Sequence, residues 1–248
     1  MKISEEVNGY WDQRSRGFSE SVNNEWAEKG SVPVNGIIER LQACKGSSFL
    51  DVGCGPGYYS VALAGMGFDV TGVDYSEEML FQAKKNASEH NVDPEFLRSD
   101  AASLPFKDGS FDFIVSRNVL WNLSEPKKAY SEMLRVLRPG GKAFLADGNF
   151  YNYLFDAEYA ELHRKFQAAH GDRQEGHMKF NRGDVDFSIM EELARSLPLS
   201  KERRPFWDIR TLTDLGCNSI DIRYPPGPQV FGSDACRLVT GFEIIFRK

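Results

Sequence analysis

Three glycines at alternate positions and one acid further along the chain are the residues best suited to hold a ligand. Gly53, Gly55 and Gly57 follow the apolar run 48–52, and Asp74 comes later, at the end of another apolar run. Glycine lets the backbone turn with positive φ and lets a ligand approach without a Cβ atom in the way. Backbone N–H groups near a helix start bind polar ligand atoms, and a carboxylate can accept both hydroxyls of a ribose. This spacing indicates a nucleoside site.

The flanking sequence predicts the elements that position this site. Residues 48–52 are typical of a buried parallel strand, and residues 58–67 form a helix-length apolar run closed by glycine. Residues 68–73 indicate a second strand, which ends at Asp74. The predicted unit is strand, glycine loop, helix, strand and acid, and its ligand is expected at the carboxyl ends of the strands.

The third glycine separates two kinds of nucleotide site. A dinucleotide fingerprint has glycine where this chain has Tyr58, because a pyrophosphate must approach the backbone closely. Gly57 comes one residue too early for that pattern. The pattern favours an enzyme whose nucleoside cofactor has no pyrophosphate, and two alternatives to it stay open. One is a regulatory or accessory protein that binds the nucleoside without chemistry, and the other, less favoured, is an NAD-dependent oxidoreductase.

Five stretches, in the right order, resemble the class I S-adenosyl-L-methionine (SAM) dependent methyltransferases, in their type 11 or UbiE-like branch. They are the glycine loop, Asp74, Ser99-Asp100-Ala101, Leu104-Pro105-Phe106 and the segment RVLRPGGKAFLAD that ends at Asp147. Together they lie within residues 47–147 of the 248. The resemblance implies SAM as cofactor, S-adenosyl-L-homocysteine as product and a small-molecule acceptor. It leaves open whether an N, O or C atom accepts the methyl group.

The resemblance also implies residues around the cofactor. In this family an acid at the place of Asp100 bonds the adenine amino group, and the alternative here is an Asx-turn. Arg14 is predicted to meet the carboxylate of the methionine part, and the alternative is a solvated surface arginine. The predicted cofactor-binding residues are Asp51, Gly53, Gly55, Gly57, Asp74, Tyr75, Asp100, Ala101, Arg117, Tyr10 and Arg14.

The sequence does not identify a catalytic residue. Methyl transfer is an in-line displacement at an already activated sulfonium methyl group, so the protein mainly aligns the reactants and excludes water. A base is needed only where the acceptor must lose a proton early. The candidates near the chemistry are Tyr10, Tyr151 and Tyr153, with His163 behind them, and their rings would also suit a cationic acceptor. Many relatives have a histidine pair where positions 121–122 are Trp and Asn, which are predicted to shape the pocket or simply to pack.

The resemblance implies one α/β domain with a Rossmann-like, doubly wound, mostly parallel seven-stranded sheet, an antiparallel last strand and a helical cap insertion. Further strands are expected at 94–98, 111–116, 143–147, 217–222 and 238–246. Helices are expected at 76–90, after Ser124, after Ser188 and at 212–215. The predicted divisions are an N-terminal helical lid (1–46), a cofactor-binding core (47–148), a substrate-cap insertion (149–210) and the final strands (211–248). The alternative to a lid is that the N-terminal aromatics only cover one end of the sheet.

Composition limits the partners. The formal net charge of −6 disfavours nucleic acid, because phosphate binding needs a basic face. We find neither an apolar run of about 18 residues, as a membrane helix needs, nor a signal-peptide core. The four cysteines lack zinc spacing. Gly171 and Gly176 interrupt any helix that would place His163, His170 and His177 on one face, so no metal site is predicted. We expect a cytoplasmic protein that acts on a small molecule without membrane or nucleic acid, in an unknown oligomeric state.

Overall fold

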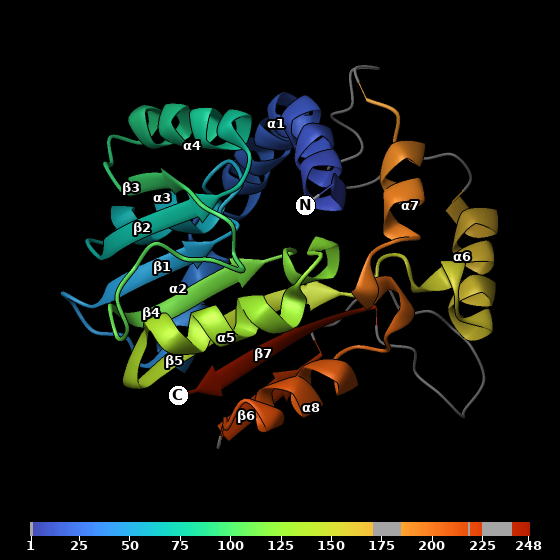
Figure 1. Ribbon diagram of the computed structural model, residues 1–248. Coiled ribbons are helices and arrows are strands. Elements are labelled where there is room, and N and C mark those ends of the chain that lie inside the picture. The colour runs from blue at the N-terminus through green and yellow to red at the C-terminus, as the bar shows by residue number, and fades with distance from the viewer. Residues whose placement is uncertain (1, 171–184, 218, 225–239) are drawn as a thin grey trace.

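One seven-stranded sheet organises the protein. The structure, a computed structural model, describes residues 2–170, 185–217, 219–224 and 240–248. Within these ranges the strand order is β3-β2-β1-β4-β5-β7-β6 (Figure 1). The strands are β1 (Ser48–Val52), β2 (Asp69–Asp74), β3 (Glu95–Arg98), β4 (Phe111–Arg117), β5 (Leu137–Gly148), β6 (Ser219–Arg223) and β7 (Gly241–Arg247). Pairing is parallel from β3 to β5, and β7 is antiparallel to both of its neighbours, which confirms the predicted fold class.

Helices cover both faces of this sheet. They are α1 (Lys2–Lys29), α2 (Val32–Leu41), α3 (Tyr58–Gly65), α4 (Glu77–Glu89), α5 (Pro126–Val136), α6 (Ala157–His170), α7 (Ser188–Ala194) and α8 (Phe206–Asp214). Short 3-10 helices are η1 (Leu120–Asn122), η2 (Asn152–Leu154) and η4 (Pro198–Lys201). Among the described helices, none has both the length and the apolar character needed to cross a membrane.

Alternation along β1 explains the two layers. Phe49 packs with α2 and α3 on one face, whereas Leu50 and Val52 pack with α5 and α8 on the other. Successive strand residues point to opposite faces, so a strand that is apolar throughout must be covered on both. The sequence run 48–52 has this character. The sheet is therefore buried in the middle, and a ligand can reach it only at the strand ends.

Two predicted boundaries are wrong. The fifth strand begins at Leu137 rather than residue 143, because Leu137 already pairs with Phe111 before the register shifts. The helix expected at 212–215 begins at Phe206, directly after Pro205. Proline lacks an N–H group, which costs nothing at the start of a helix, so Pro205 introduces α8 instead of ending an irregular segment. The region expected as insertion therefore includes the first turns of α8.

Serines at three helix starts behave differently. Ser76 caps α4, since its Oγ accepts a hydrogen bond from a first-turn backbone N–H at 3.0 Å. Ser124 and Ser188 are not side-chain caps. The Ser124 hydroxyl instead lies 2.7 Å from the hydroxyl of Ser4, and the Ser188 backbone N–H donates to Asp186 at 2.9 Å. Tertiary contact between α1 and the loop before α5 thus takes the hydroxyl that local capping would use.

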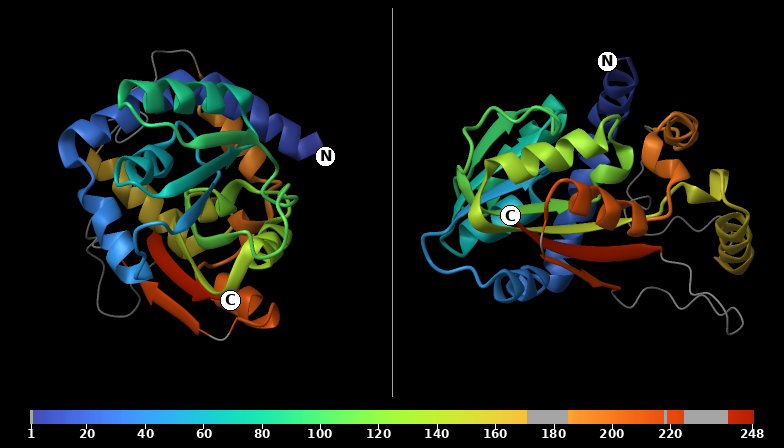
Figure 2. Two further views of the ribbon diagram at one scale, coloured as in Figure 1. Left: turned by 90° about the vertical axis from the view of Figure 1, so that its left-hand side faces the viewer. Right: turned by 60° about the horizontal axis from the view of Figure 1, so that its bottom comes forward.

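Helix α1 contacts both the sheet with its covering helices, which we call the core, and the helices of residues 149–210, which we call the cap. It is one continuous helix of 28 residues. It contacts α4 of the core and α7 of the cap. In the right-hand view of Figure 2, α1 stands between the core and the α6–α7 pair, which lies beyond the carboxyl ends of the parallel strands. This arrangement places three walls, namely α1, the strand ends and the cap, around one space.

Candidate active site

A cavity of about 820 Å³ lies where these three walls meet. Most of the residues predicted to bind the cofactor line it: Asp51, Gly53, Gly55, Asp74, Tyr75, Asp100, Ala101, Arg117 and Tyr10. The weak catalytic candidates Tyr151, Tyr153 and His163 line it too. Gly57 and Arg14 are not among its lining residues. The sheet edge therefore brings together residues spread over most of the chain.

The glycine loop bends under the cavity with left-handed backbone angles. Gly53 has φ of 67° and Gly55 has φ of 52°. A Cβ atom on Gly53 would lie 2.3 Å from the side chain of Val119, so no larger residue fits there. The backbone N–H of Gly53 donates to the carbonyl of Val73 at 2.8 Å, which ties the loop to the end of β2. Glycine is required here by backbone geometry and by close packing.

Asp74 is held in place by two backbone N–H groups. One carboxylate oxygen accepts from Gly55 at 2.8 Å, and the other accepts from Ser76 at 2.9 Å. Each oxygen of an ionised carboxylate has a further lone pair. Asp74 is thus positioned to accept two hydroxyl groups side by side. Burial raises the pKa of this carboxyl, and the two backbone hydrogen bonds oppose that rise.

Asp51 is the more deeply buried acid beneath the loop. One of its oxygens accepts from the backbone N–H and the hydroxyl of Ser60, at 3.0 and 2.7 Å. Burial raises the pKa of Asp51 to about 7, despite these bonds from Ser60. Asp51 therefore ties β1 to the first turns of α3 and adds a titratable group to the floor of the cavity.

Asp100 follows β3 at the far end of the same edge. It is exposed, and its Oδ1 accepts from the backbone N–H of Ala102 at 2.8 Å. The Asx-turn that was the alternative interpretation is therefore present. It uses one carboxylate oxygen, so Asp100 can make the turn and still face a ligand in the cavity it lines.

Arg14 lies away from the cavity lining. Its side chain is 2% exposed, and its guanidinium lies 5.0 Å from the ring centre of Phe187. This contact joins α1 to the start of α7. Gly57 is the N-cap of α3, with φ of 88°, and a Cβ atom there would meet Ala83 of α4. Both residues support the elements around the cavity, and the ligand contact predicted for them stays a prediction.

Aromatic rings form one continuous side of the cavity, which we call the aromatic wall. Neighbouring ring centres along it lie between 3.9 and 6.3 Å apart. In order, the wall consists of Phe18, Trp11, Trp121, Tyr151, Tyr153 and His163. It starts above the glycine loop, where Phe18 lies near Gly55, and ends in the cap. The cavity thus changes from a polar end at the strands to an apolar end at the cap.

The phenols at the apolar end hold their protons firmly. Burial raises the pKa of Tyr10 to about 12 and raises the pKa values of Tyr151 and Tyr153 further. The hydroxyl of Tyr153 donates a hydrogen bond to Glu191 at 2.9 Å. At neutral pH these groups can donate hydrogen bonds, but they cannot serve as ready bases. His163 stacks on Tyr153 with ring centres 3.9 Å apart. Of the other histidines considered above, His177 lies outside the described residues.

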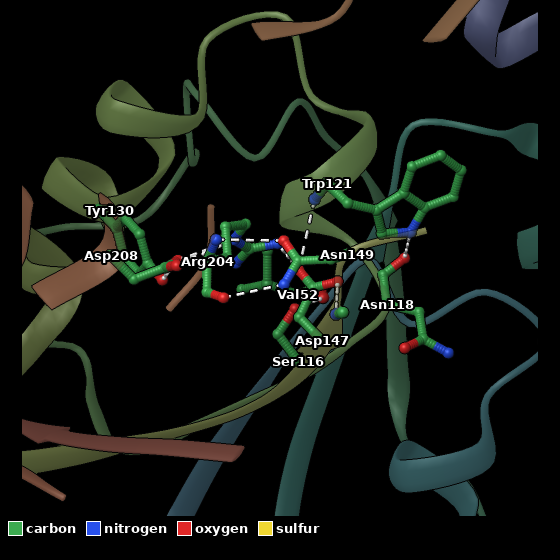
Figure 3. Close-up of polar contacts among 10 residues, drawn as sticks. Val52, Ser116, Asn118, Trp121, Tyr130, Asp147, Asn149, Arg204 and Asp208 are labelled. Atoms are coloured by element: carbon green, nitrogen blue, oxygen red, sulfur yellow. Dashed lines mark hydrogen bonds and ion pairs between the residues drawn. The ribbon is translucent and has the colours of Figure 1, made fainter. Parts of the chain in front are cut away.

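Figure 3 shows a buried ion cluster that holds the backbone of Trp121 in place. Arg204 donates to Asp147 at 2.7 Å and to Asp208 at 2.7 Å, and all three side chains are no more than 1% exposed. Tyr130 donates to Asp208 at 2.6 Å, and the backbone N–H of Trp121 donates to Asp147 at 3.3 Å. The cluster therefore connects α5, β5, α8 and the aromatic wall. Arg204 and Asp208 are one helical turn apart, but Tyr130 and Asp147 lie far from them along the chain, so no local pattern indicated the whole cluster.

Helix α1 contributes the expected aromatics of the lid and also Ser4 and Glu25, which the sequence interpretation missed. Ser4, Trp11, Phe18 and Glu25 all line the cavity and follow one another at intervals of seven residues. Seven residues are close to two turns of an α-helix, so these side chains share one face. The seven-residue spacing is visible in the sequence, but it indicates a shared face only if the region is one uninterrupted helix.

Comparison with known proteins agrees with this geometry. Residues 50–145 match the methyltransferase domain family. The demethylmenaquinone methyltransferase of Renibacterium salmoninarum is 40% identical over 111 residues, 45% of this chain and 45% of the relative. That of Staphylococcus aureus is 36% identical over 141 residues, 55% of this chain and 58% of the relative. The chain thus spans about half the length of these curated relatives.

A solved structure extends the likeness to the whole fold. It is a Methanococcus maripaludis protein assigned as a SAM-dependent methyltransferase, with a TM-score of 0.61 and 24% identity over 96% of this chain and 94% of that protein. At this identity the likeness concerns the fold. The family match decides the class of this segment. Residues 50–145 form a methyltransferase domain.

The charges around the cavity suit the cofactor of this methyltransferase domain, which is SAM. Among the described lining residues there are six carboxylates and two full cations. The acids are Glu25, Glu28, Asp51, Asp74, Asp100 and Glu125, and the cations are Lys29 and Arg117. SAM brings a sulfonium and an ammonium group against one carboxylate, so an acidic lining attracts it. The same lining repels the pyrophosphate of a dinucleotide.

Proposed function

We propose that this protein transfers the methyl group of SAM to a small-molecule acceptor with a flat, apolar ring. The observation that carries the proposal is the order of groups along one sheet edge. Asp100 follows β3, Asp74 ends β2 and the glycine loop follows β1, all on one cavity that continues into the aromatic wall. A nucleoside laid along this edge meets a base-binding acid, a ribose-binding acid and a close-approach loop in the right order.

The protein's part in this chemistry is alignment. Bound SAM supplies an activated methyl group, which an in-line attack can remove. Asp74 would hold the ribose and the glycine loop would support the chain that bears the sulfur. The aromatic wall would orient the acceptor and exclude water from the space between acceptor and methyl group. His163 is the described wall residue that could take a proton directly from an acceptor, since the phenols beside it hold theirs.

The apolar end of the cavity supports the acceptor class. Its wall offers ring faces and no guanidinium or ammonium group among the described lining residues near the cap. Flat apolar rings stack on such surfaces, whereas an anionic acceptor would lack a counter-charge. The curated relatives named above are demethylmenaquinone methyltransferases, whose name denotes a quinone substrate. The net charge of −6 disfavours nucleic acid as acceptor. A cytoplasmic location stays a prediction from the sequence.

Cofactor binding is the first test. Calorimetric titration with S-adenosyl-L-homocysteine should give binding that Asp74→Asn weakens at least about tenfold, near 1.4 kcal/mol, because a charge-assisted pair of hydrogen bonds is lost. Asparagine keeps the size of the side chain and one oxygen, which can still accept from one of the two backbone N–H groups that Asp74 bonds. Asp69→Asn is the control, because Asp69 lies at the exposed opposite end of the same strand. NADH binding in preference to the homocysteine product would favour the oxidoreductase alternative.

Transfer itself needs a separate test. The protein is incubated with methyl-labelled SAM and a panel of hydroxylated aromatic rings, amines and carboxylic acids, and labelled products are identified by mass spectrometry. We expect label on ring compounds and none on simple carboxylic acids. Binding of the homocysteine product without transfer to any panel member or to a metabolite extract would favour the regulatory alternative.

A further inference from the structure

Glu25, near the end of α1, reaches across the cavity to the end of β4. Its two carboxylate oxygens accept from one guanidinium nitrogen of Arg117, at 3.1 and 2.9 Å. The same carboxylate lies 3.1 Å from the ammonium group of Lys29, one turn along α1. Both full cations among the described lining residues are therefore occupied by one side chain.

The position of Arg117 along the sheet edge tells which part of the cofactor comes near it. The edge runs from β3 through β2 and β1 to β4. With the adenine at Asp100 and the ribose at Asp74, the amino-acid part of SAM continues over the β1 loop towards β4. Arg117 is the last residue of β4 and lines the same cavity. This reasoning rests on the proposed function.

The amino-acid part of SAM ends in a carboxylate and an ammonium group. Six of the eight charged lining residues described are acids, so the ammonium has many partners, while the carboxylate has only the corner at Arg117 and Lys29. A carboxylate binds a guanidinium best, through paired hydrogen bonds. The corner that suits the ligand's carboxylate is the one that Glu25 fills.

A buried hydroxyl marks the same corner. The ring of Tyr58 lies under the guanidinium of Arg117, which is 4.7 Å from the ring centre. Tyr58 lines the cavity, and its hydroxyl oxygen is buried and has no hydrogen-bond partner among the described residues. A buried hydroxyl without a partner costs free energy, so binding of a ligand group that accepts a hydrogen bond from it would be favoured.

We propose that the α-carboxylate of SAM binds Arg117 in place of Glu25. Glu25 is then an internal competitor for the cofactor, and binding exchanges one carboxylate for another on the same guanidinium. The hydroxyl of Tyr58 donates to the incoming carboxylate. Glu25 does not lose all its partners in the exchange, because Lys29 stays beside it on α1. Cofactor binding thus competes with the Glu25–Arg117 ion pair, which holds α1 against the core.

Two ligands isolate this subsite. S-adenosyl-L-homocysteine has the amino-acid part, and 5′-methylthioadenosine shares its nucleoside and sulfur but has no carboxylate. Both are titrated calorimetrically into wild-type protein, Glu25→Gln, Arg117→Met and the double variant. Glu28→Gln is the matched control, because Glu28 lies one turn from Glu25 and lines the same cavity, but no ion pair joins it to Arg117.

Glu25→Gln should bind S-adenosyl-L-homocysteine about fivefold more tightly, since a partly exposed competing ion pair is removed. Arg117→Met should bind it at least about tenfold more weakly. Neither variant should change the affinity for 5′-methylthioadenosine by more than about twofold, which also reports that the site is folded. In the double variant the gain from Glu25→Gln should vanish, because the two changes act on one contact.

The outcomes separate this inference from the function it rests on. Wild-type protein that binds neither ligand would overturn the proposed function and the inference with it. The inference alone would be overturned if both ligands bind and Glu28→Gln raises the affinity for S-adenosyl-L-homocysteine as much as Glu25→Gln does. The effect would then be general charge repulsion. A gain from Glu25→Gln that persists without Arg117 would overturn it as well.

Discussion

At the scale of single residues, the methyltransferase domain keeps acids buried where a cation is expected to bind. Asp51 and Asp74 lie at the ends of neighbouring strands at the glycine loop, and burial raises the pKa of both. Such groups are unfavourable in the empty site when they are ionised, because a charge in a low-dielectric surrounding loses hydration. A sulfonium or ammonium ligand reverses this by supplying the opposite charge. The free energy of folding that is lost by burying these ionised acids is thus linked to the affinity for the cofactor.

Asp51 makes this link measurable through pH. Its pKa is raised from 3.8 to about 7, so between these values the folded protein holds a proton that the unfolded chain has released. The free energy of unfolding should therefore fall as pH rises from about 4 to 7, by up to about 1.4 kcal/mol per pH unit. Asp51→Asn should flatten this part of the profile in urea unfolding experiments. Asp69→Asn, on an exposed site, should leave it intact, and parallel profiles for wild type and Asp51→Asn would contradict the assignment.

At the scale of elements, the cap is attached to the core through charge as well as apolar contact. Arg204 comes from the segment just before α8, and its partners Asp147 and Asp208 come from β5 and α8. Asn149, directly after β5, exchanges hydrogen bonds with the Arg204 backbone at 2.8 and 3.1 Å. A cluster with so many partners fixes the start of the cap relative to the sheet, and through Asp147 it fixes the aromatic wall.

Removing the central cation should be costly. Arg204→Met leaves two buried carboxylates without their counter-charge, so we expect a loss of about 3–5 kcal/mol in the free energy of unfolding. The neighbouring Arg203 pairs with Asp156 and Glu158, and its side chain is 48% exposed. Arg203→Met should therefore cost less than about 1 kcal/mol. Chemical denaturation of both variants measures the contrast, and equal losses would refute the role given to Arg204.

At the scale of the whole molecule, we propose that the chain folds as a single domain in which lid, core and cap are parts of one unit. The apolar cluster of the cap contains Val7 and Tyr10 of α1, and the cluster of the core contains Val22 of the same helix. A continuous helix that is buried at both ends couples the two clusters, because neither can open without exposing part of α1.

Thermal unfolding tests this coupling. Scanning calorimetry should give one transition whose calorimetric and van't Hoff enthalpies agree. S-adenosyl-L-homocysteine should move that whole transition upwards in proportion to the logarithm of its concentration, since it binds only the folded chain. Two resolved transitions, with only the later one shifted by the ligand, would instead indicate a core that folds apart from its cap.

The sequence by itself determined the sheet, the cofactor end of the cavity and the polar groups that line it. These features are local: a strand shows in its apolar run, and a loop that needs positive φ shows in its glycines. Gly53, Asp74 and Asp100 could be placed because each directly follows or ends a strand, and parallel strand ends lie at one edge. Their adjacency follows from topology that short motifs already specify.

Only the tertiary structure decided how distant segments share that cavity. Arg14 packs on Phe187, and Glu25, which no local pattern indicated, meets Arg117. Helical periodicity gives the face of α1, but which face turns inward depends on how α1 packs against α4 and α7. Asp208 is one helical turn from Arg204, but the partner Asp147 could not be foreseen, because a buried cation is satisfied by whichever carboxylates the fold brings within hydrogen-bonding distance.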